Sequence, residues 1–322
     1  MRGFIGKTTL FLLGLLLMIT AAILLSASCG PFDSVFAFIT CSEDYTNDEE
    51  VVKAGTILSA MEKGNDYTSL IIGDSVSYML FAPFQEFNEE YLVGSASRPF
   101  TMAGQYVVAK EFLDSHPDAK EVYLFFSKES WEAILDVQCG YNQAVVPMIL
   151  SGTYDDLDDE TKEDNIKTYG RFLLNPYIVD IFHRSRLNHK LVLNGLIEYH
   201  EKILGEDCSA LYEKTDGEIS PLSKVYFKKL VNLCGEHDVT LHVLHDPMAD
   251  TEKKHKEIKK EKKELKEAGY MDIYDEYFES VVYYPKDEFI DEIHFGVTTD
   301  QKKKAIADIK KRHGYLQGFA VE

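Results

Sequence analysis

The most apolar part of the chain is its N-terminal segment. Residues 8–28 contain no charged side chain. A helix of this length can cross the hydrocarbon layer of a bilayer, which is ~30 Å thick. Arg2 and Lys7 precede the segment, and Asp33 is the first charged residue after it. The positive-inside rule therefore predicts a cytoplasmic N-terminus and an extracytoplasmic remainder of the chain.

Two other interpretations of this segment stay open. A cleaved signal peptide usually has a shorter apolar region, but the small residues at 26–28 would suit a signal peptidase. Cys29 directly follows them, as in a lipidated protein, although Ser26 stands where Leu would be expected. We favour an uncleaved signal anchor over residues 1–29. All three interpretations place the rest of the chain outside the cytoplasm.

After a stalk or lead-in over residues 30–64, short apolar runs alternate with helical patterns. The apolar runs predict strands at 67–73, 91–93, 121–126, 239–244 and 281–284. Helical spacing predicts helices at 51–64, 99–112, 225–233 and 298–312. Strands separated by helices imply a mostly parallel sheet covered by helices on both faces. We expect an α/β domain over residues 65–322, built as a three-layer α/β/α sandwich.

The middle of the chain interrupts this alternation. Residues 130–222 hold an acidic stretch at 154–165 and a helical run at 169–204, which together predict a helical insertion. The acidic stretch lacks the spacing and the Gly of an EF-hand, so a solvated loop is favoured over a Ca²⁺ site. Residues 252–268 carry Lys and Glu at helical spacing. They predict an exposed helix with ion pairs four residues apart.

The net charge argues against one class of partner, and the cysteine spacing argues against a disulfide framework or a metal site. The 322 residues include 34 Lys+Arg and 54 Asp+Glu, for a formal net charge of -20, which argues against nucleic acid as a partner. The five widely spaced cysteines show no disulfide framework and no metal site. A Cys139–Cys208 bridge has no further support, and Cys234 lies in an apolar run that predicts a buried thiol. We expect neither a metal nor another cofactor.

Two short motifs carry candidate chemistry. Gly73, Asp74 and Ser75 directly follow the first predicted strand, and Asp291 and His294 precede the last predicted helix. A serine hydroxyl becomes a nucleophile when an imidazole takes its proton, and a carboxylate orients that imidazole. Ser75 would lie at the carboxyl edge of a parallel sheet, where open α/β folds bind ligands. The motifs predict a catalytic triad, with Asp74 as a turn-former beside the nucleophile.

These motifs resemble the first and last blocks of the SGNH (GDSL-type) hydrolase superfamily. The resemblance implies that Ser75 is the nucleophile and that His294 and Asp291 complete the triad. It also implies an oxyanion hole with an N–H from Gly94, after the second strand, and an Asn after the third strand. This chain has no Asn there, and Ser127 stands at the end of that strand. Ser127, Lys128 and the distant Asn142 are therefore all candidates for the missing donor, and the sequence does not choose among them.

Several other residues near the expected site have less specific roles. Arg98 follows the expected oxyanion loop and could hold a phosphate or a carboxylate, with a structural ion pair as the equal alternative. His242 and His245 lie near the end of the fourth predicted strand, where a hydrogen bond within the loop is favoured over a binding role. Trp131, the single tryptophan, predicts core packing in preference to stacking on a sugar.

The order of elements over most of residues 65–312 resembles the cell-envelope acyltransferase branch of that superfamily. This branch includes the DltD-type proteins of lipoteichoic-acid alanylation and the SGNH partners in polysaccharide O-acetylation. The resemblance implies a bacterial membrane protein that passes an acetyl or alanyl group through acyl-Ser75 to an envelope polysaccharide or teichoic acid. It also implies a membrane-bound O-acyltransferase as the acyl donor. A non-catalytic docking protein of the same fold is the alternative, and a secreted lipase-like hydrolase is a third hypothesis.

Overall fold

The computed structural model describes residues 2–28, 56–95, 101–133, 145–183 and 219–322. The chain divides into two compact units. We call Met1–Asp48 with Lys162–Leu211 the anchor unit, and Glu49–Thr161 with Tyr212–Glu322 the α/β unit. The second segment of the anchor unit lies inside the insertion that the sequence predicts. Arg98, Asn142 and the cysteines at 29, 41, 139 and 208 lie outside the described residues.

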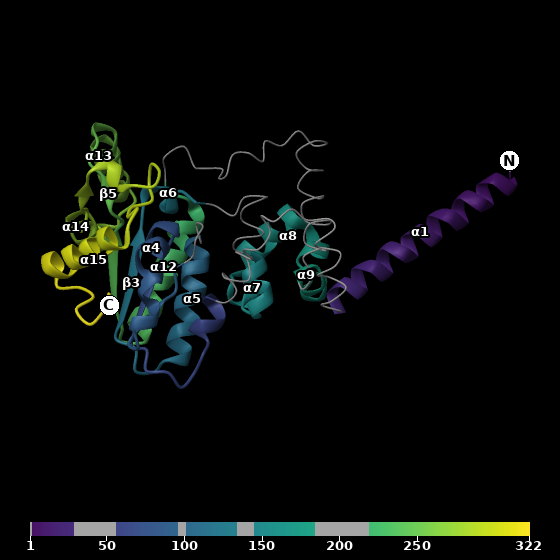
Figure 1. Cartoon of the computed structure of the whole chain (residues 1–322), viewed down its shortest axis with the longest axis horizontal. Coiled ribbons are helices and arrows are strands. Elements are labelled where there is room, and N and C mark those ends of the chain that lie inside the picture. Colours follow the sequence, from purple (N-terminus) through teal and green to yellow (C-terminus); the bar gives the residue numbers. More distant parts are fainter. Residues whose placement is uncertain (1, 29–55, 96–100, 134–144, 184–218) are drawn as a thin grey trace. The chain divides into compact units, whose positions relative to one another are not determined.

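The anchor unit contains α1 (Arg2–Ser28), the long purple helix of Figure 1, and α9 (Pro176–His183), which packs against it. Within α1, Gly6–Leu25 has a mean hydropathy of 2.5 and is long and apolar enough to span a membrane. Most of α8 (Asp159–Leu173) also belongs to this unit. It changes direction at Gly170, whose φ of +77° is readily adopted only by glycine.

The acidic stretch at 154–165 is helical over most of its length, so the prediction of a solvated loop is wrong. A short 3₁₀ helix covers Tyr154–Asp156, and α8 begins at Asp159. The Asp158 carboxylate accepts the N–H of Thr161 at 2.8 Å, as an N-cap residue does. The carboxylates that follow lie in the first turn of α8, where the helix dipole favours negative charge. Their position at a helix start explains the concentration of acidic residues.

The α/β unit is built on a parallel four-stranded sheet in the order β2-β1-β3-β4. Its strands are β1 (Ser69–Gly73), β2 (Tyr91–Val93), β3 (Glu121–Phe126) and β4 (Thr240–His245). All four lie within two residues of the strands expected from the sequence, which confirms the α/β class. Because the strands are parallel, their carboxyl ends share one edge, and Ser75, Ser127 and Asp246 follow three of them.

The predicted strand at 281–284 does not join this sheet. It contributes β6 (Tyr283–Tyr284), which pairs in parallel with β5 (Met248–Ala249) in a separate two-stranded sheet. Pro247 stands between β4 and β5. Because proline has no N–H to donate, the chain leaves the main ladder there.

Alternate residues of each strand belong to two separate core clusters, because successive side chains of a strand point to opposite faces. Leu70 and Ile72 of β1 join a cluster that includes residues of α5 (Met102–Ser115) and α12 (Pro221–Glu236). Ile71 joins a second cluster with residues of α4 (Ser75–Phe81) and α15 (Thr299–His313). Trp131 and Cys234 are buried in the first cluster, as expected.

Helix α13 (Glu252–Glu267) confirms one part of its prediction and corrects another. The expected ion pairs four residues apart are present, including Lys256 with Glu252 at 2.6 Å. The helix is not exposed all round, however. One face is buried and includes Lys254, Ile258, Glu261 and Leu265. That face packs with α14 (Met271–Glu279) and brings two charged side chains into the interior.

Candidate active site

Ser75 is the first residue of α4, immediately beyond the carboxyl end of β1. Gly73 ends the strand with a φ of +156°, and a Cβ at this position would collide with the Phe125 carbonyl oxygen and the Ser77 hydroxyl. Glycine is therefore required both by backbone conformation and by space. Gln105 donates its side-chain N–H to the Gly73 carbonyl at 2.8 Å. The Gln105 hydrogen bond and the close packing around Gly73 together fix the turn that carries Ser75.

The structure brings Ser75, His294 and Asp291 together. His294 Nε2 lies 2.9 Å from Ser75 Oγ, and His294 Nδ1 lies 2.6 Å from Asp291 Oδ2. With the proton on Nδ1 donated to the carboxylate, Nε2 is left to accept the serine hydroxyl. Ser75 is 8% exposed, so its hydroxyl is largely shielded from water but reachable. This is the geometry that a serine nucleophile needs.

The loop that carries Asp291 and His294 is fastened at its base. Phe289 and Phe295 form an antiparallel bridge, and both rings are buried. The Ile290 N–H donates to the His294 carbonyl at 2.8 Å, and Phe295 lies against Tyr284 of β6 with ring centroids 4.4 Å apart. The aromatic base holds the loop in place while its tip remains at the surface.

Asp291 is held as a carboxylate by its own loop. Its Oδ1 accepts the backbone N–H groups of Ile293 and His294, both at 2.8 Å. Partial burial raises the pKa of Asp291, but these hydrogen bonds and the His294 ring together lower it below its ordinary value of 3.8. Asp291 is therefore ionised at neutral pH and can stabilise a positive charge on His294.

Asp74 is a turn-former with a wider set of partners than the sequence indicated. Its Oδ1 accepts the Val76 N–H at 2.8 Å, which caps α4. Its Oδ2 accepts the hydroxyl of Ser127 at 3.3 Å and the hydroxyl of Ser130. The buried Asp74 carboxylate therefore joins the turn that carries Ser75 to the end of β3. Ser130 was missed from sequence, although its spacing of three residues from Ser127 could have indicated a shared partner.

Gly94, the oxyanion donor that the resemblance implies, and Ser127, a candidate for the missing donor, both donate elsewhere. The Gly94 N–H donates to the Ile71 carbonyl at 2.7 Å and so extends the pairing of β2 with β1. A Cβ on Gly94 would come within 3.0 Å of Leu70 and Val108, so close packing accounts for this glycine. The Ser127 hydroxyl donates to Asp74. The Ser75 N–H is in the first turn of α4, where backbone donors have no acceptor within the helix.

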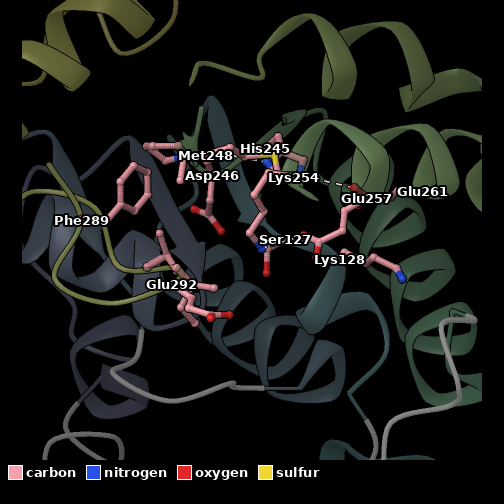
Figure 2. A pocket seen from close by; sticks show the side chains of 14 residues that line it. Ser127, Lys128, His245, Asp246, Met248, Lys254, Glu257, Glu261, Phe289 and Glu292 are labelled. Carbon is pink, nitrogen blue, oxygen red and sulfur yellow. Dashed lines mark hydrogen bonds and ion pairs between the residues drawn. The ribbon is translucent and has the colours of Figure 1, made fainter. Parts of the chain in front are cut away.

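A pocket that is open to solvent lies next to Ser75 and His294, at the carboxyl ends of β3 and β4. Val76 and Ile293, which neighbour the triad residues in sequence, line it. Figure 2 shows Ser127 and the Asp246 carboxylate near its centre, with Phe289 and Glu292 on one side. The remaining labelled lining residues are Lys128, His245, Met248, Lys254, Glu257 and Glu261. Polar or charged side chains make up eight of the fourteen lining residues.

Several charged groups of the pocket have partners, either within the lining or beside it. Lys254 Nζ lies 2.8 Å from Glu257 Oε2, and Lys128 Nζ lies 2.8 Å from Glu132 Oε1. Glu261, only 3% exposed, accepts the Tyr277 hydroxyl at 2.7 Å. Sequence reasoning missed Lys254 and Glu261 because only two apolar residues of α13, Ile258 and Leu265, mark its buried face.

The two histidines near the end of β4 have different surroundings. His245 lines the pocket, and its Nδ1 lies 2.7 Å from the Asp246 carbonyl oxygen, which is the loop hydrogen bond expected from sequence. His242 packs between Tyr123 and Tyr315, with ring centroids 4.9 and 4.6 Å away, and is not among the residues that line the pocket. Only His245 therefore contributes to the site.

No family model, no curated protein and no solved structure matches this chain. The functional assignment must accordingly come from the geometry of the site and from the motifs in the sequence.

Proposed function

We propose that the protein is a membrane-anchored serine acyltransferase or esterase of the SGNH type. The observation that carries the proposal is the continuous hydrogen-bonded series from Ser75 through His294 to Asp291, at 2.9 and 2.6 Å. A serine nucleophile needs a base beside it and a carboxylate that orients the base, and this series supplies both. The three-layer α/β/α sandwich of flavodoxin-like type belongs to the same proposal.

The proposed reaction has two halves. Ser75 Oγ attacks the acyl carbonyl carbon while His294 Nε2 takes the hydroxyl proton, and Asp291 stabilises the resulting imidazolium. The tetrahedral intermediate expels the alkoxide of the donor, which receives the proton from His294, and acyl-Ser75 remains. An acceptor hydroxyl then gives its proton to His294 and attacks acyl-Ser75. Collapse of the second intermediate releases the new ester and returns the proton to Ser75.

The nature of the acceptor distinguishes a transferase from an esterase. Water gives hydrolysis, and a polymer hydroxyl gives transfer. We propose an envelope polysaccharide or teichoic acid as acceptor, an acetyl or alanyl group as cargo, and a membrane-bound O-acyltransferase as donor, all by resemblance. We further propose that α1 stays uncleaved with its N-terminus in the cytoplasm, which places Ser75 outside the membrane.

Labelling with a fluorophosphonate probe tests the proposal directly. The wild-type chain should react at Ser75 and lose turnover of a short acyl ester in parallel with labelling. Ser75→Ala should remain unlabelled, and Ser77→Ala should still label, because the Ser77 hydroxyl donates to the Asp74 carbonyl and not to His294. Intact turnover in purified Ser75→Ala protein would refute the proposal.

A second candidate function is a non-catalytic SGNH-fold protein that docks on a membrane-bound O-acyltransferase. The observation in its favour is that the Gly94 N–H, which the resemblance implies in the oxyanion hole, and the Ser127 hydroxyl, a candidate for it, are engaged with Ile71 and Asp74. Loss of oxyanion donors costs typically 10²–10³-fold each in rate. The same probe separates the two functions, because a serine without activation would not be labelled.

A further inference from the structure

The turn between α8 and α9 presents two exposed aromatic side chains. Phe172 is 62% exposed and Tyr177 is 80% exposed. The turn itself is ordered by hydrogen bonds. Asn175 Oδ1 accepts the N–H groups of Tyr177 and Ile178 at 3.0 and 3.4 Å, and the Asn175 N–H donates to the Phe172 carbonyl at 3.2 Å. Exposed aromatic rings on a well-defined turn are typical of an interaction surface.

The position of α9 within the anchor unit indicates what covers this turn. Helix α9 packs against α1. Apart from Gly14, the described side chains of α1 that are half-buried are Ala22 and Ile23. Both lie within the apolar span Gly6–Leu25. The half-buried side chains of α1 therefore lie in the last turns of the span, close to the boundary of any membrane that α1 crosses.

The short length of α9 keeps the aromatic turn within reach of the same boundary. Its eight residues span about 12 Å at the α-helical rise, and the turn lies at its N-terminal end. The headgroup layer beside the hydrocarbon core is about 5–8 Å thick. Tyrosine is enriched there because its ring is apolar and its hydroxyl is polar. Arg171, adjacent to Phe172, suits the phosphate groups of that layer.

We propose that the α8–α9 turn, with Phe172 and Tyr177, inserts into the headgroup region of the phospholipid bilayer spanned by α1. The turn is then a second membrane contact, made by a segment far from α1 in sequence. It limits how freely the anchor unit can tilt about α1. The proposal rests on the insertion of α1 and is independent of the chemistry at Ser75.

Tryptophan fluorescence in brominated lipid tests this contact in the full-length protein. The wild-type chain has a single tryptophan, Trp131, which is buried and supplies a constant background. Tyr177→Trp protein is reconstituted into phosphatidylcholine vesicles with plain or dibrominated acyl chains. We expect the added emission to be shifted to shorter wavelength and to fall by at least about half in brominated vesicles.

Phe87→Trp is the matched control, because Phe87 is also an exposed ring, at 44%, but lies in the α/β unit. Its emission should be the same in both kinds of vesicle. Equal emission from Tyr177→Trp in plain and brominated vesicles would overturn the proposal and would favour a protein partner for the turn. Equal quenching at positions 87 and 177 would overturn it as well. Release of the wild-type chain from membranes by alkaline extraction would show that α1 does not span the bilayer, and would overturn the proposal for that reason.

Discussion

His294 Nε2 lies 2.9 Å from Ser75 Oγ, although the two residues are 219 positions apart in the chain. The hydrogen bond joins the carboxyl end of β1 to the loop before α15. It depends on the packing of the α/β unit as a whole, because neither segment can place its side chain opposite the other alone. The consequences of this arrangement for activity can be tested at each partner.

Ser75 and His294 should act as one unit. Ser75→Ala and His294→Ala should each lower kcat for a short acyl ester by roughly 10⁴-fold or more, and the double variant should be no slower than either single variant. Steady-state kinetics on the three proteins checks this expectation. Effects that multiply in the double variant would mean that the two side chains act independently.

Asp291→Asn should lower kcat by about 10³–10⁴-fold, because an amide cannot hold His294 in the same protonation state and orientation. The pKa of Asp291 lies below 3.8, so its carboxylate is fully formed throughout pH 5–8. The loss should therefore be of similar size across that range, measured as kcat against pH. Asp287→Asn, an exposed change in the same segment, should leave kcat within twofold of wild type. A similarly small effect at Asp291 would exclude its proposed role.

Ser130→Ala should slow the reaction because Ser130 helps to position the turn that carries Ser75, without taking part in the chemistry itself. It removes one of the hydroxyl groups that donate to the buried Asp74 carboxylate, at a cost of about 1–3 kcal/mol. We expect kcat to fall roughly 10-fold or more with little change in KM, and Ser130→Thr to recover part of the loss. Ser151→Ala removes a hydroxyl that donates to the Met148 carbonyl and should leave kcat unchanged. An equal loss in both alanine variants would indicate a general effect on folding.

Gly73→Ala should destabilise the α/β unit by about 2–6 kcal/mol. The substitution adds a left-handed strain of about 1–3 kcal/mol and a steric clash of about 1–3 kcal/mol. Urea unfolding in detergent measures the change. Gly235→Ala is the matched control, because nothing lies within 4 Å of its added Cβ, and alanine is the better helix former. Similar stability of the two variants would contradict the proposed constraint at Gly73.

Asp158 should contribute pH-dependent stability. Partial burial raises its pKa, but the Thr161 N–H and the Lys229 ammonium lower it to about 2. Since the unfolded-state pKa is about 3.9, the contribution is complete above that pH and is lost as the pH falls towards 2. Asp158→Asn should therefore be less stable than wild type at pH 6, and the difference should narrow by pH 3. Urea unfolding at both pH values measures it.

Asp155→Asn is the control for this prediction, because Asp155 is exposed in the preceding 3₁₀ helix. It should change stability little at either pH. A difference between wild type and Asp158→Asn that stays constant from pH 6 to pH 3 would show that the charge of Asp158 is not the cause.

Local sequence patterns determined the elements of the α/β unit and the candidate triad. The strand at 121–126 has the same bounds in the sequence prediction and in the structure. Five apolar residues follow Glu121 without interruption, and such a run is stable only when it is buried. The helix at 298–312 was predicted within one residue, and it begins with a capping box between Thr298 and Gln301. Ser75, Asp291 and His294 could be selected because their side chains have distinctive chemistry at distinctive positions.

Tertiary structure decided how those elements and side chains are used. In the folded chain the Gly94 N–H donates to the Ile71 carbonyl, and the hydroxyl groups of Ser127 and Ser130 donate to Asp74. Strand β6 pairs with β5, and Glu261 is buried beside the pocket. The physical reason is that hydropathy and spacing report the burial and periodicity of a single segment. A hydrogen-bond partner or a shared sheet is chosen by groups brought together from distant parts of the chain, and those contacts exist only once the sheet and its helices have packed.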